Sequence, residues 1–269
     1  MVSFGGSRGN VNLASGVCSS RPLIGVLGGA GPLASSAFLA SVYEGGVSDP
    51  EQDQPRILLL SDPSLDDRTA MLRTGQRRRL AEAVRVRLEQ LEAGGAQFLI
   101  LCCFTAHAVV PFLPSRLQER LVRLPDVALG LVAKRRESTL VLCTEGARLA
   151  RLFESSPLWS DVACHVEFPD AMLQEHVHDL IYQLKTGLSP ERGLNRLETV
   201  LGTGSAGALL CGCTEFHLLS RARRTSTDLS SPAWIDPLEY LALAIRDGRL
   251  ADTVSGLGSV HTPGRLPGY

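Results

Sequence analysis

Two nine-residue segments, LILCCFTAH at 99–107 and LLCGCTEFH at 209–217, are the most informative about the fold of this chain. In each, an apolar run typical of a buried strand leads into a cysteine, and polar residues that can open a helix follow. The cysteines at these equivalent positions are Cys103 and Cys213. If the fold brings them together, a substrate can lie between two thiols, which suits the transfer of a proton from one face of a carbon to the other.

The composition is that of a globular protein and excludes several classes of partner. The chain has 269 residues, enough for one large domain or two of ordinary size, with 44% hydrophobic and 20% charged residues. A net charge of -1 gives no electrostatic reason to expect a nucleic acid or an anionic membrane as partner. No apolar run approaches the roughly 20 residues that a membrane span requires.

The two ends and the cysteine count indicate where the protein works. Residues 1–21 lack a hydrophobic signal core and are expected to be a disordered extension, and residues 256–269 a flexible tail. The chain has seven cysteines, an odd number that suits a reducing compartment better than a disulfide framework. We therefore expect a cytoplasmic protein.

Strand and helix patterns alternate along the chain, which predicts an α/β fold with parallel sheets and ligands at the carboxyl ends of the strands. The expected strands are 23–27, 56–60, 97–102, 139–142, 163–168 and 208–212, and the expected helices are 33–44, 76–92, 106–121, 144–153, 173–185 and 191–201. Because this order repeats after about 100 residues, we expect two similar α/β domains that arose by duplication. Domain 1 is predicted at 22–125, completed by 232–255, and domain 2 at 126–231.

Cys103 and Cys213 stand out because each follows a strand and precedes an expected helix start, where the pKa of a thiol is lowered. The other five cysteines, at 18, 102, 143, 164 and 211, can be small apolar core residues. Zinc binding is disfavoured because the chain has no Cys-x-x-Cys pair. A thiol protease would leave one of the two cysteines unused. His107 and His217 each follow their cysteine by four residues, so each is either an acid/base assistant or a structural histidine.

The glycine-rich turn at 28–32 supports an alternative. Residues 29–34 fit the loose dinucleotide pattern Gly-x-Gly-x-x-Ala after a strand, so an NAD-dependent oxidoreductase is one candidate. Against it, Pro32 removes a backbone N–H where a pyrophosphate needs donors. The turn can instead offer amides, Gly29 among them, to a small carboxylate, or be only a tight connection between strand and helix.

Three further polar residues have both a functional and a structural interpretation. Arg68 lies in an expected loop at 66–69, where it either grips a substrate carboxylate through two hydrogen bonds or belongs to a solvated charged loop. Thr214 and Glu215 lie at the expected first turn of a helix, where capping alone explains them.

Several segments together resemble the aspartate/glutamate racemase family and its broad-specificity amino-acid racemase branch, in order from about residue 23 to residue 245. They are IGVLGGAGP at 24–32, DRT at 67–69, CFTAH at 103–107, CTEG at 143–146, Ile181-Tyr182 with Lys185 and Gly187, and GCTE at 212–215. The resemblance implies two α/β domains related by pseudo-two-fold symmetry, with the active site in the interdomain cleft. It implies an enzyme, an isomerase without cofactor or metal, that acts on a small amino acid or related carboxylate, with a homodimer as the plausible assembly.

By the same resemblance, Cys103 and Cys213 are the acid/base pair, one removing the α-proton and the other delivering a proton to the opposite face. The substrate-binding residues that it implies are Gly29, Arg68, Phe104, Thr105, Lys185, Thr214 and Glu215, of which Arg68 and Lys185 contact substrate anions. One departure matters: Phe104 stands where the family has an asparagine. Hence a two-cysteine isomerase, cyclase or decarboxylase of a biosynthetic pathway, and a non-catalytic paralogue, stay open as alternatives.

Overall fold

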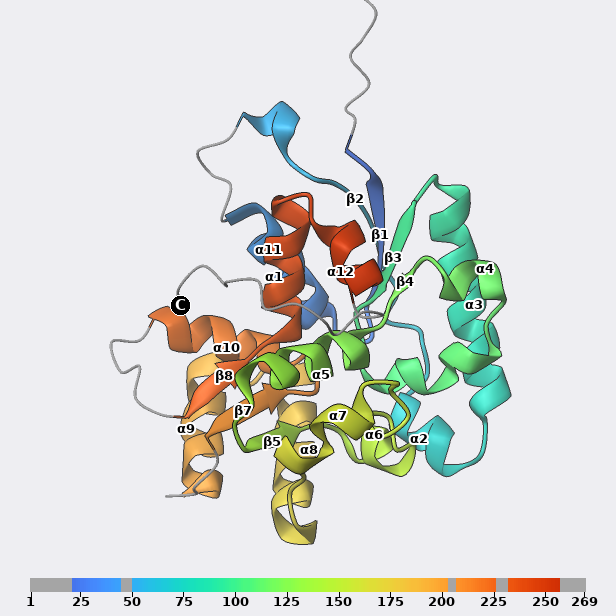
Figure 1. Ribbon diagram of the computed structural model, residues 1–269. Coiled ribbons are helices and arrows are strands. Elements are labelled where there is room, and N and C mark those ends of the chain that lie inside the picture. Colours follow the sequence, from blue (N-terminus) through green and yellow to red (C-terminus); the bar gives the residue numbers. More distant parts are fainter. Residues whose placement is uncertain (1–20, 45–49, 203–206, 226–231, 257–269) are drawn as a thin grey trace, which may run out of the picture.

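The computed structural model describes residues 21–44, 50–202, 207–225 and 232–256, and its strands form two separate parallel sheets (Figure 1). The predicted disordered extension and flexible tail lie outside the described residues, apart from Arg21 and Gly256. The predicted fold class, a two-domain α/β fold with parallel sheets, is confirmed.

The first sheet has the strand order β2-β1-β3-β4, and the second has the equivalent order β6-β5-β7-β8. All neighbouring strands pair in parallel. The strands are β1 (Leu23–Gly28), β2 (Arg56–Ser61), β3 (Phe98–Leu101), β4 (Leu121–Val122), β5 (Thr139–Leu142), β6 (Val166–Glu167), β7 (Ala208–Cys211) and β8 (Ala233–Ile235). The third strand of each half therefore occupies the same place in its sheet, and these are the two strands that lead to Cys103 and Cys213.

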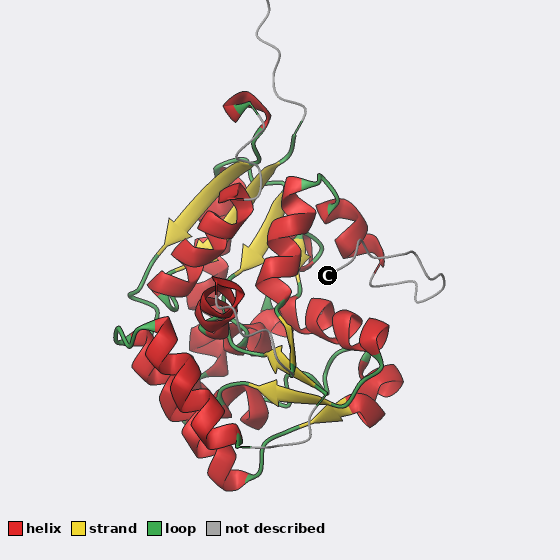
Figure 2. Ribbon diagram, turned by 90° about the vertical axis from the view of Figure 1, so that its left-hand side faces the viewer, coloured by secondary structure: helices red, strands yellow, loops and turns green. Residues whose placement is uncertain are grey.

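Helices flank both sheets (Figure 2). The α-helices are α1 (Pro32–Glu44), α2 (Arg68–Arg73), α3 (Arg77–Ala93), α4 (Ser115–Gln118), α5 (Leu124–Arg135), α6 (Glu145–Leu149), α7 (Trp159–Val162), α8 (Ala171–Lys185), α9 (Pro190–Leu201), α10 (Phe216–Thr225), α11 (Pro237–Arg246) and α12 (Leu250–Gly256). Three short 3-10 helices are η1 (Glu51–Asp53), η2 (Thr105–Phe112) and η3 (Ala163–His165). Within the described ranges, no helix has both the length and the apolar character needed to cross a membrane.

Four predicted elements differ from the structure, and one of them is the helix expected at 144–153, which is shortened to α6 and ends at Leu149. The helix expected at 106–121 is divided into η2, α4 and β4, because Pro111 and Pro114 each lack the N–H that a continuous α-helix needs. The strand expected at 163–168 is shortened to β6, since 163–165 form η3. The loop expected at 66–69 instead starts α2, with the Asp67 side chain accepting a hydrogen bond from the backbone N–H of Ala70 at 2.8 Å.

The C-terminal part of the chain is shared between the halves. The prediction that 232–255 completes domain 1 is wrong for β8, which pairs with β7 and extends the second sheet. The following helix, α11, does pack against α1 of the first half, and it also packs against α5. β8 therefore belongs to the second sheet, whereas α11 returns to the first half.

One hydrophobic core joins the two halves. It contains Val26 and Ile100 from the first sheet and Val141 from the second, all at most 1% exposed. The rings of Phe104 and Phe153 meet across it with their centroids 5.9 Å apart. Because protein cores are close-packed, this shared core fixes the position of one sheet, and of its cysteine loop, relative to the other.

Candidate active site

Each of the two cysteines lies two residues beyond the end of the third strand of its sheet. Cys103 follows β3, which ends at Leu101, and Cys213 follows β7, which ends at Cys211. Their side chains are almost completely buried, at 6% and 5% exposed. The carboxyl ends of parallel strands are the usual location of ligand sites, so the fold presents one thiol at that location in each half.

The Cys213 thiol donates a hydrogen bond to Glu215 Oε2 at 2.8 Å, and the Thr214 hydroxyl donates to the same oxygen at 3.3 Å. Burial and the negative charge of Glu215 raise the pKa of Cys213 well above its usual value, against the opposing effect of Lys185. The expectation that a helix start lowers this pKa is wrong for Cys213, because burial and the Glu215 carboxylate raise the pKa by more than Lys185 and the backbone N–H of Glu215 lower it. Cys213 therefore rests as a thiol.

Arg68 is buried and does not belong to a solvated loop. Its guanidinium donates to the backbone carbonyls of Ala30 at 2.8 Å and Leu65 at 3.2 Å. These contacts hold the first residue of α2 against the glycine-rich turn that follows β1. Arg68 is only 8% exposed, so the interpretation of this residue as part of a solvated charged loop is wrong.

Arg68 also connects the two cysteine loops. Burial lowers its pKa, but the charges of Cys103, Asp67 and Glu215 and a hydrogen bond with Cys103 offset this effect and raise the pKa above its usual value. The guanidinium thus neighbours the thiol of one half and the carboxylate that holds the thiol of the other half. The polar chain runs from Cys103 through Arg68 and Glu215 to Cys213.

The glycine-rich turn contacts Glu215 through Gly31 and not through Gly29. A Cβ atom on Gly31 would overlap Glu215 Oε1, so glycine leaves the space that this carboxylate occupies. Gly29 has φ +88°, a Cβ there would overlap the backbone of Asp62, and its N–H already donates to the Ser35 hydroxyl at 3.3 Å. The predicted role of Gly29 as a carboxylate binder is therefore corrected to a structural one.

The same turn is a poor pyrophosphate site. The Gly29 amide is occupied, Pro32 has no N–H, and the carboxylate of Glu215 lies beside Gly31, where it repels phosphate. The turn thus lacks free amide donors at these positions and carries a charge that repels phosphate, which argues against a dinucleotide site.

Two threonines meet across the halves. Thr105 Oγ1 and Thr144 Oγ1 are 2.7 Å apart and both side chains are buried. Thr144 also accepts from the backbone N–H of Ala147 at 3.1 Å and thereby caps α6. One of the two hydroxyls donates to the other, which leaves a single hydroxyl hydrogen of the pair to donate elsewhere.

Helix α8 brings two polar residues to the cap of α2. The Tyr182 hydroxyl donates to Asp67 Oδ2 at 2.6 Å, and burial together with this bond raises the pKa of Tyr182 to about 12. The Lys185 ammonium lies 4.3 Å from the centroid of the Tyr182 ring. Lys185 is close enough to influence both Asp67 and Cys213, so it belongs to the edge of the same polar region.

His107 is held by the backbone and is not an acid/base assistant. Its Nε2 accepts from the N–H of Leu124 at 3.2 Å, so Nδ1 carries the proton and donates to the carbonyl of Cys103 at 2.9 Å. Burial lowers the pKa of His107 to about 4, which keeps the ring neutral. The histidine supports the loop that carries Cys103.

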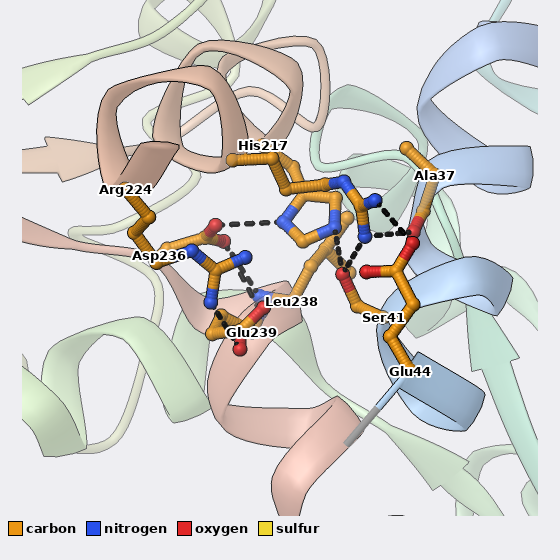
Figure 3. A network of polar contacts seen from close by, with 9 residues as sticks. Ala37, Ser41, Glu44, His217, Arg224, Asp236, Leu238 and Glu239 are labelled. Carbon is orange, nitrogen blue, oxygen red and sulfur yellow. Dashed lines mark hydrogen bonds and ion pairs between the residues drawn. The ribbon is translucent and has the colours of Figure 1, made fainter. Parts of the chain in front are cut away.

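His217 is likewise occupied on both nitrogens, as Figure 3 shows. Nδ1 contacts Asp236 Oδ2 at 2.7 Å and Nε2 contacts Ser41 Oγ at 3.1 Å, with the ring fully buried. Arg221 donates to Ser41 and forms an ion pair with Glu44 at 2.7 Å. The predicted assistance by His217 is therefore also corrected: the ring ties α10 to α1 and to the start of α11.

Comparison with known proteins identifies the family. The family model described as Asp/Glu/Hydantoin racemase matches residues 27–245, most of the chain. The chain belongs to the Asp/Glu/hydantoin racemase family. The predicted resemblance is confirmed, and family membership implies an isomerase.

Solved racemases share the fold. An aspartate racemase from Picrophilus torridus is 22% identical with a TM-score of 0.69, covering 85% of this chain and 94% of its own. A putative Asp/Glu racemase from Yersinia pestis is 19% identical with a TM-score of 0.62, covering 85% and 99%. A glutamate racemase from Campylobacter jejuni is 17% identical with a TM-score of 0.55, covering 82% and 83%. At these identities the likeness concerns the fold.

Phe104 does not line the polar region of this Asp/Glu/hydantoin racemase family member. Its side chain is 1% exposed and packs against Phe153 in the core shared by the halves. The predicted substrate contact is corrected, because a ring enclosed by apolar side chains offers no hydrogen bond to a ligand.

Sequence reasoning missed four residues of the site: Gly31, Asp67, Thr144 and Tyr182. Each lies inside a segment that carried the resemblance, so the signal was present, but only the folded contacts distinguish these residues from their neighbours.

In the described part of the chain, no group of three or more His, Cys, Asp or Glu residues could hold a metal ion. The six cysteines in that part are free thiols.

Proposed function

We propose that this member of the racemase family moves a proton between the two faces of Cα in a small amino acid, without a cofactor and with Cys103 and Cys213 as the acid/base pair. The observation that carries the proposal is the position of Arg68, which neighbours both Cys103 and the Glu215 carboxylate that accepts from Cys213. One polar chain thus connects the two thiols, and this connection supports a substrate site beside both of them.

In the proposed reaction, the Cys103 thiolate removes the α-proton of one enantiomer. The C–H bond breaks, an S–H bond forms, and the electron pair spreads from Cα into the carboxylate. The Cys213 thiol then gives its proton to the opposite face, which leaves a thiol at Cys103 and a thiolate at Cys213. The other enantiomer reacts by the same steps in reverse and restores the starting state.

Buried donors make such a step feasible. An α-proton is only weakly acidic, so the negative charge that spreads into the carboxylate needs donors that are already aligned in a water-poor site. Arg68 and the paired hydroxyls of Thr105 and Thr144 are such donors. Lys185 and Thr214 are the further residues that we propose to contact the substrate, from the edge of the polar region and from the Cys213 loop.

The resting protonation state gives the site a direction. Cys213 is a thiol because its pKa is raised and its hydrogen is bound by Glu215. Arg68 can stabilise negative charge on the Cys103 sulfur. The resting protein is thus prepared for the enantiomer whose α-proton faces Cys103.

The test is incubation of a panel of L- and D-amino acids with the protein in deuterated water, followed by chiral chromatography and mass spectrometry. The proposal expects the opposite enantiomer to appear with one deuterium at Cα. Loss of carbon dioxide, a cyclised product or a different isomer would instead identify one of the alternative two-cysteine reactions. Turnover that depends on added NAD would contradict the proposal, and a complete lack of reaction would favour a non-catalytic paralogue.

We further propose that the protein works in the cytoplasm as a homodimer. The free thiols in the described part of the chain suit a reducing compartment. Light scattering of the purified protein measures the oligomeric state, and a mass that corresponds to one chain would contradict the dimer.

A further inference from the structure

The Glu215 carboxylate is only half used by the protein. Its side chain is 2% exposed. Oε2 accepts from Cys213 and Thr214, whereas Oε1 has no hydrogen-bond partner anywhere in the described ranges. A buried carboxylate oxygen without a donor is costly, so such an atom in a folded protein calls for an explanation.

The unpartnered oxygen lies where the two halves meet. Glu215 belongs to the second half, and its Oε1 lies against Gly31 of the first half, where a Cβ atom would overlap it. The other oxygen of the same carboxylate holds the Cys213 thiol. A group bonded to the carbon that Cys213 protonates therefore lies within reach of Glu215.

A second unpartnered atom has the opposite charge. Arg68 Nε is buried and has no hydrogen-bond partner among the residues that the structure describes, although the two Nη atoms donate to backbone carbonyls. Glu215 and Arg68 are near enough to affect each other electrostatically. The site thus offers one anionic acceptor and one cationic donor, which is the pattern that a zwitterion complements.

Phe104 provides no competing polar contact, because its ring is enclosed in the core with Phe153. We propose that Glu215 Oε1 binds the α-ammonium group of the substrate, so that the protein acts on free α-amino acids and not on their N-acyl derivatives or hydantoins. This inference rests on the proposed function and names the substrate class of the same site. Arg68 Nε then donates to the α-carboxylate.

The ammonium contact has a chemical consequence for the proton transfer. A protonated amine withdraws electron density from Cα, which helps the α-proton to leave. Its positive charge also offsets the negative charge of Glu215, which is one of the two main causes that raise the pKa of Cys213. Substrate binding therefore helps Cys213 to become a thiolate, as the reverse direction requires.

The first test compares three sets of probes on the wild-type protein. They are L- and D-alanine, aspartate and methionine, the N-acetyl derivatives of the same compounds, and the hydantoins with the same side chains. Calorimetry measures binding, and mass spectrometry measures deuterium incorporation at Cα. The inference predicts that the free amino acids bind, and that the N-acetyl derivatives and hydantoins bind about 100-fold or more weakly.

The second test uses Glu215→Gln, which keeps an oxygen for the Cys213 thiol but removes the charge. We expect KM, or Kd where no turnover occurs, to rise about tenfold or more for free amino acids. Glu198→Gln on an exposed helix position is the matched control and leaves both constants unchanged. If Glu215→Gln does not fold, the probe comparison on the wild type still decides the inference.

The outcomes separate this inference from the proposed function. Cysteine-dependent exchange of N-acetyl derivatives or hydantoins, as fast as or faster than that of the free amino acids, would overturn the ammonium site and leave the two-thiol proposal standing. Binding of free amino acids that Glu215→Gln weakens, without exchange at Cα, would support the site and contradict the reaction. A protein that neither binds nor exchanges any free amino acid would overturn both.

Discussion

The thiol of Cys213 donates a hydrogen bond of 2.8 Å to Oε2 of Glu215, two residues further along the chain. Glu215 in turn lies against Gly31 and near Arg68, both from the other half of the molecule. A contact between near neighbours in sequence is therefore also the point at which the second cysteine loop meets the first half. The charge on Glu215 influences the protonation of Cys213 directly.

Replacing Glu215 with glutamine is expected to lower the pKa of Cys213. The wild-type value is raised by burial and by the Glu215 charge, and the substitution removes the second cause while the first remains. The measurement is the ultraviolet absorbance of thiolate against pH, with Cys213→Ala used to assign the transition. A Cys213 transition that stays at the same pH, or moves upward, would contradict this assignment of cause.

Phe104→Ala is expected to destabilise the protein by about 3–5 kcal/mol, because it removes a buried aromatic ring from the core between the halves. Phe112→Ala is the matched control: its side chain is 52% exposed, and the expected change is within about 0.5 kcal/mol. Chemical denaturation measures both. Equal effects of the two substitutions would mean that Phe104 does not pack as described.

His107 is expected to make the protein less stable as the pH falls from 6.5 towards 4. The pKa of its ring is lowered from 6.5 to about 4 in the folded state, so between these values the unfolded chain binds the proton more readily. The free energy of unfolding should therefore fall by about 3 kcal/mol across this window on account of His107. His107→Asn keeps a donor near the Cys103 carbonyl and should remove most of this dependence. An unchanged slope in the variant would contradict the assignment.

Asp236 is expected to make the stability of the protein depend on pH at lower pH values than His107 does. Burial raises its pKa, but contacts with His217, Ser220 and the backbone of Glu239 together lower it to below the usual 3.8. Its stabilising contribution is complete above that value and disappears as the pH falls through the folded pKa. Asp236→Asn should cost about 1–3 kcal/mol at neutral pH, and the difference from wild type should shrink below about pH 4. A difference that is constant with pH would show that the charge of Asp236 does not contribute.

The long periodic elements and the strand-end cysteines were predictable from sequence because they depend on local patterns. β1, α1 and α8 follow the expected periodicity. Each cysteine was expected directly after its strand, and it lies two residues beyond the end of β3 or β7. β8 was assigned to the wrong half because a strand of three residues is placed by pairing, which local sequence does not encode. The same holds for the histidines: spacing places His107 one turn from Cys103, but only the fold shows that Leu124 occupies its second nitrogen.

Phe104 illustrates the limit most clearly. Its place directly after Cys103 favoured a substrate contact, yet successive side chains after a strand point in different directions, and this one enters the apolar core. Glu215 is the opposite case. Capping explained it adequately from sequence, and its importance emerges only from Gly31 and Arg68, which are distant in the chain.

The most direct test of the account is Cα deuterium incorporation and racemisation in four single variants. Cys103→Ala and Cys213→Ala are expected to lose about 10²–10⁴-fold or more of the activity while remaining folded. Cys102→Ala and Cys211→Ala alter buried neighbouring thiols that the proposed reaction does not use, and they should retain activity close to that of the wild type. Racemisation that persists at the wild-type rate without either Cys103 or Cys213 would contradict the two-thiol mechanism.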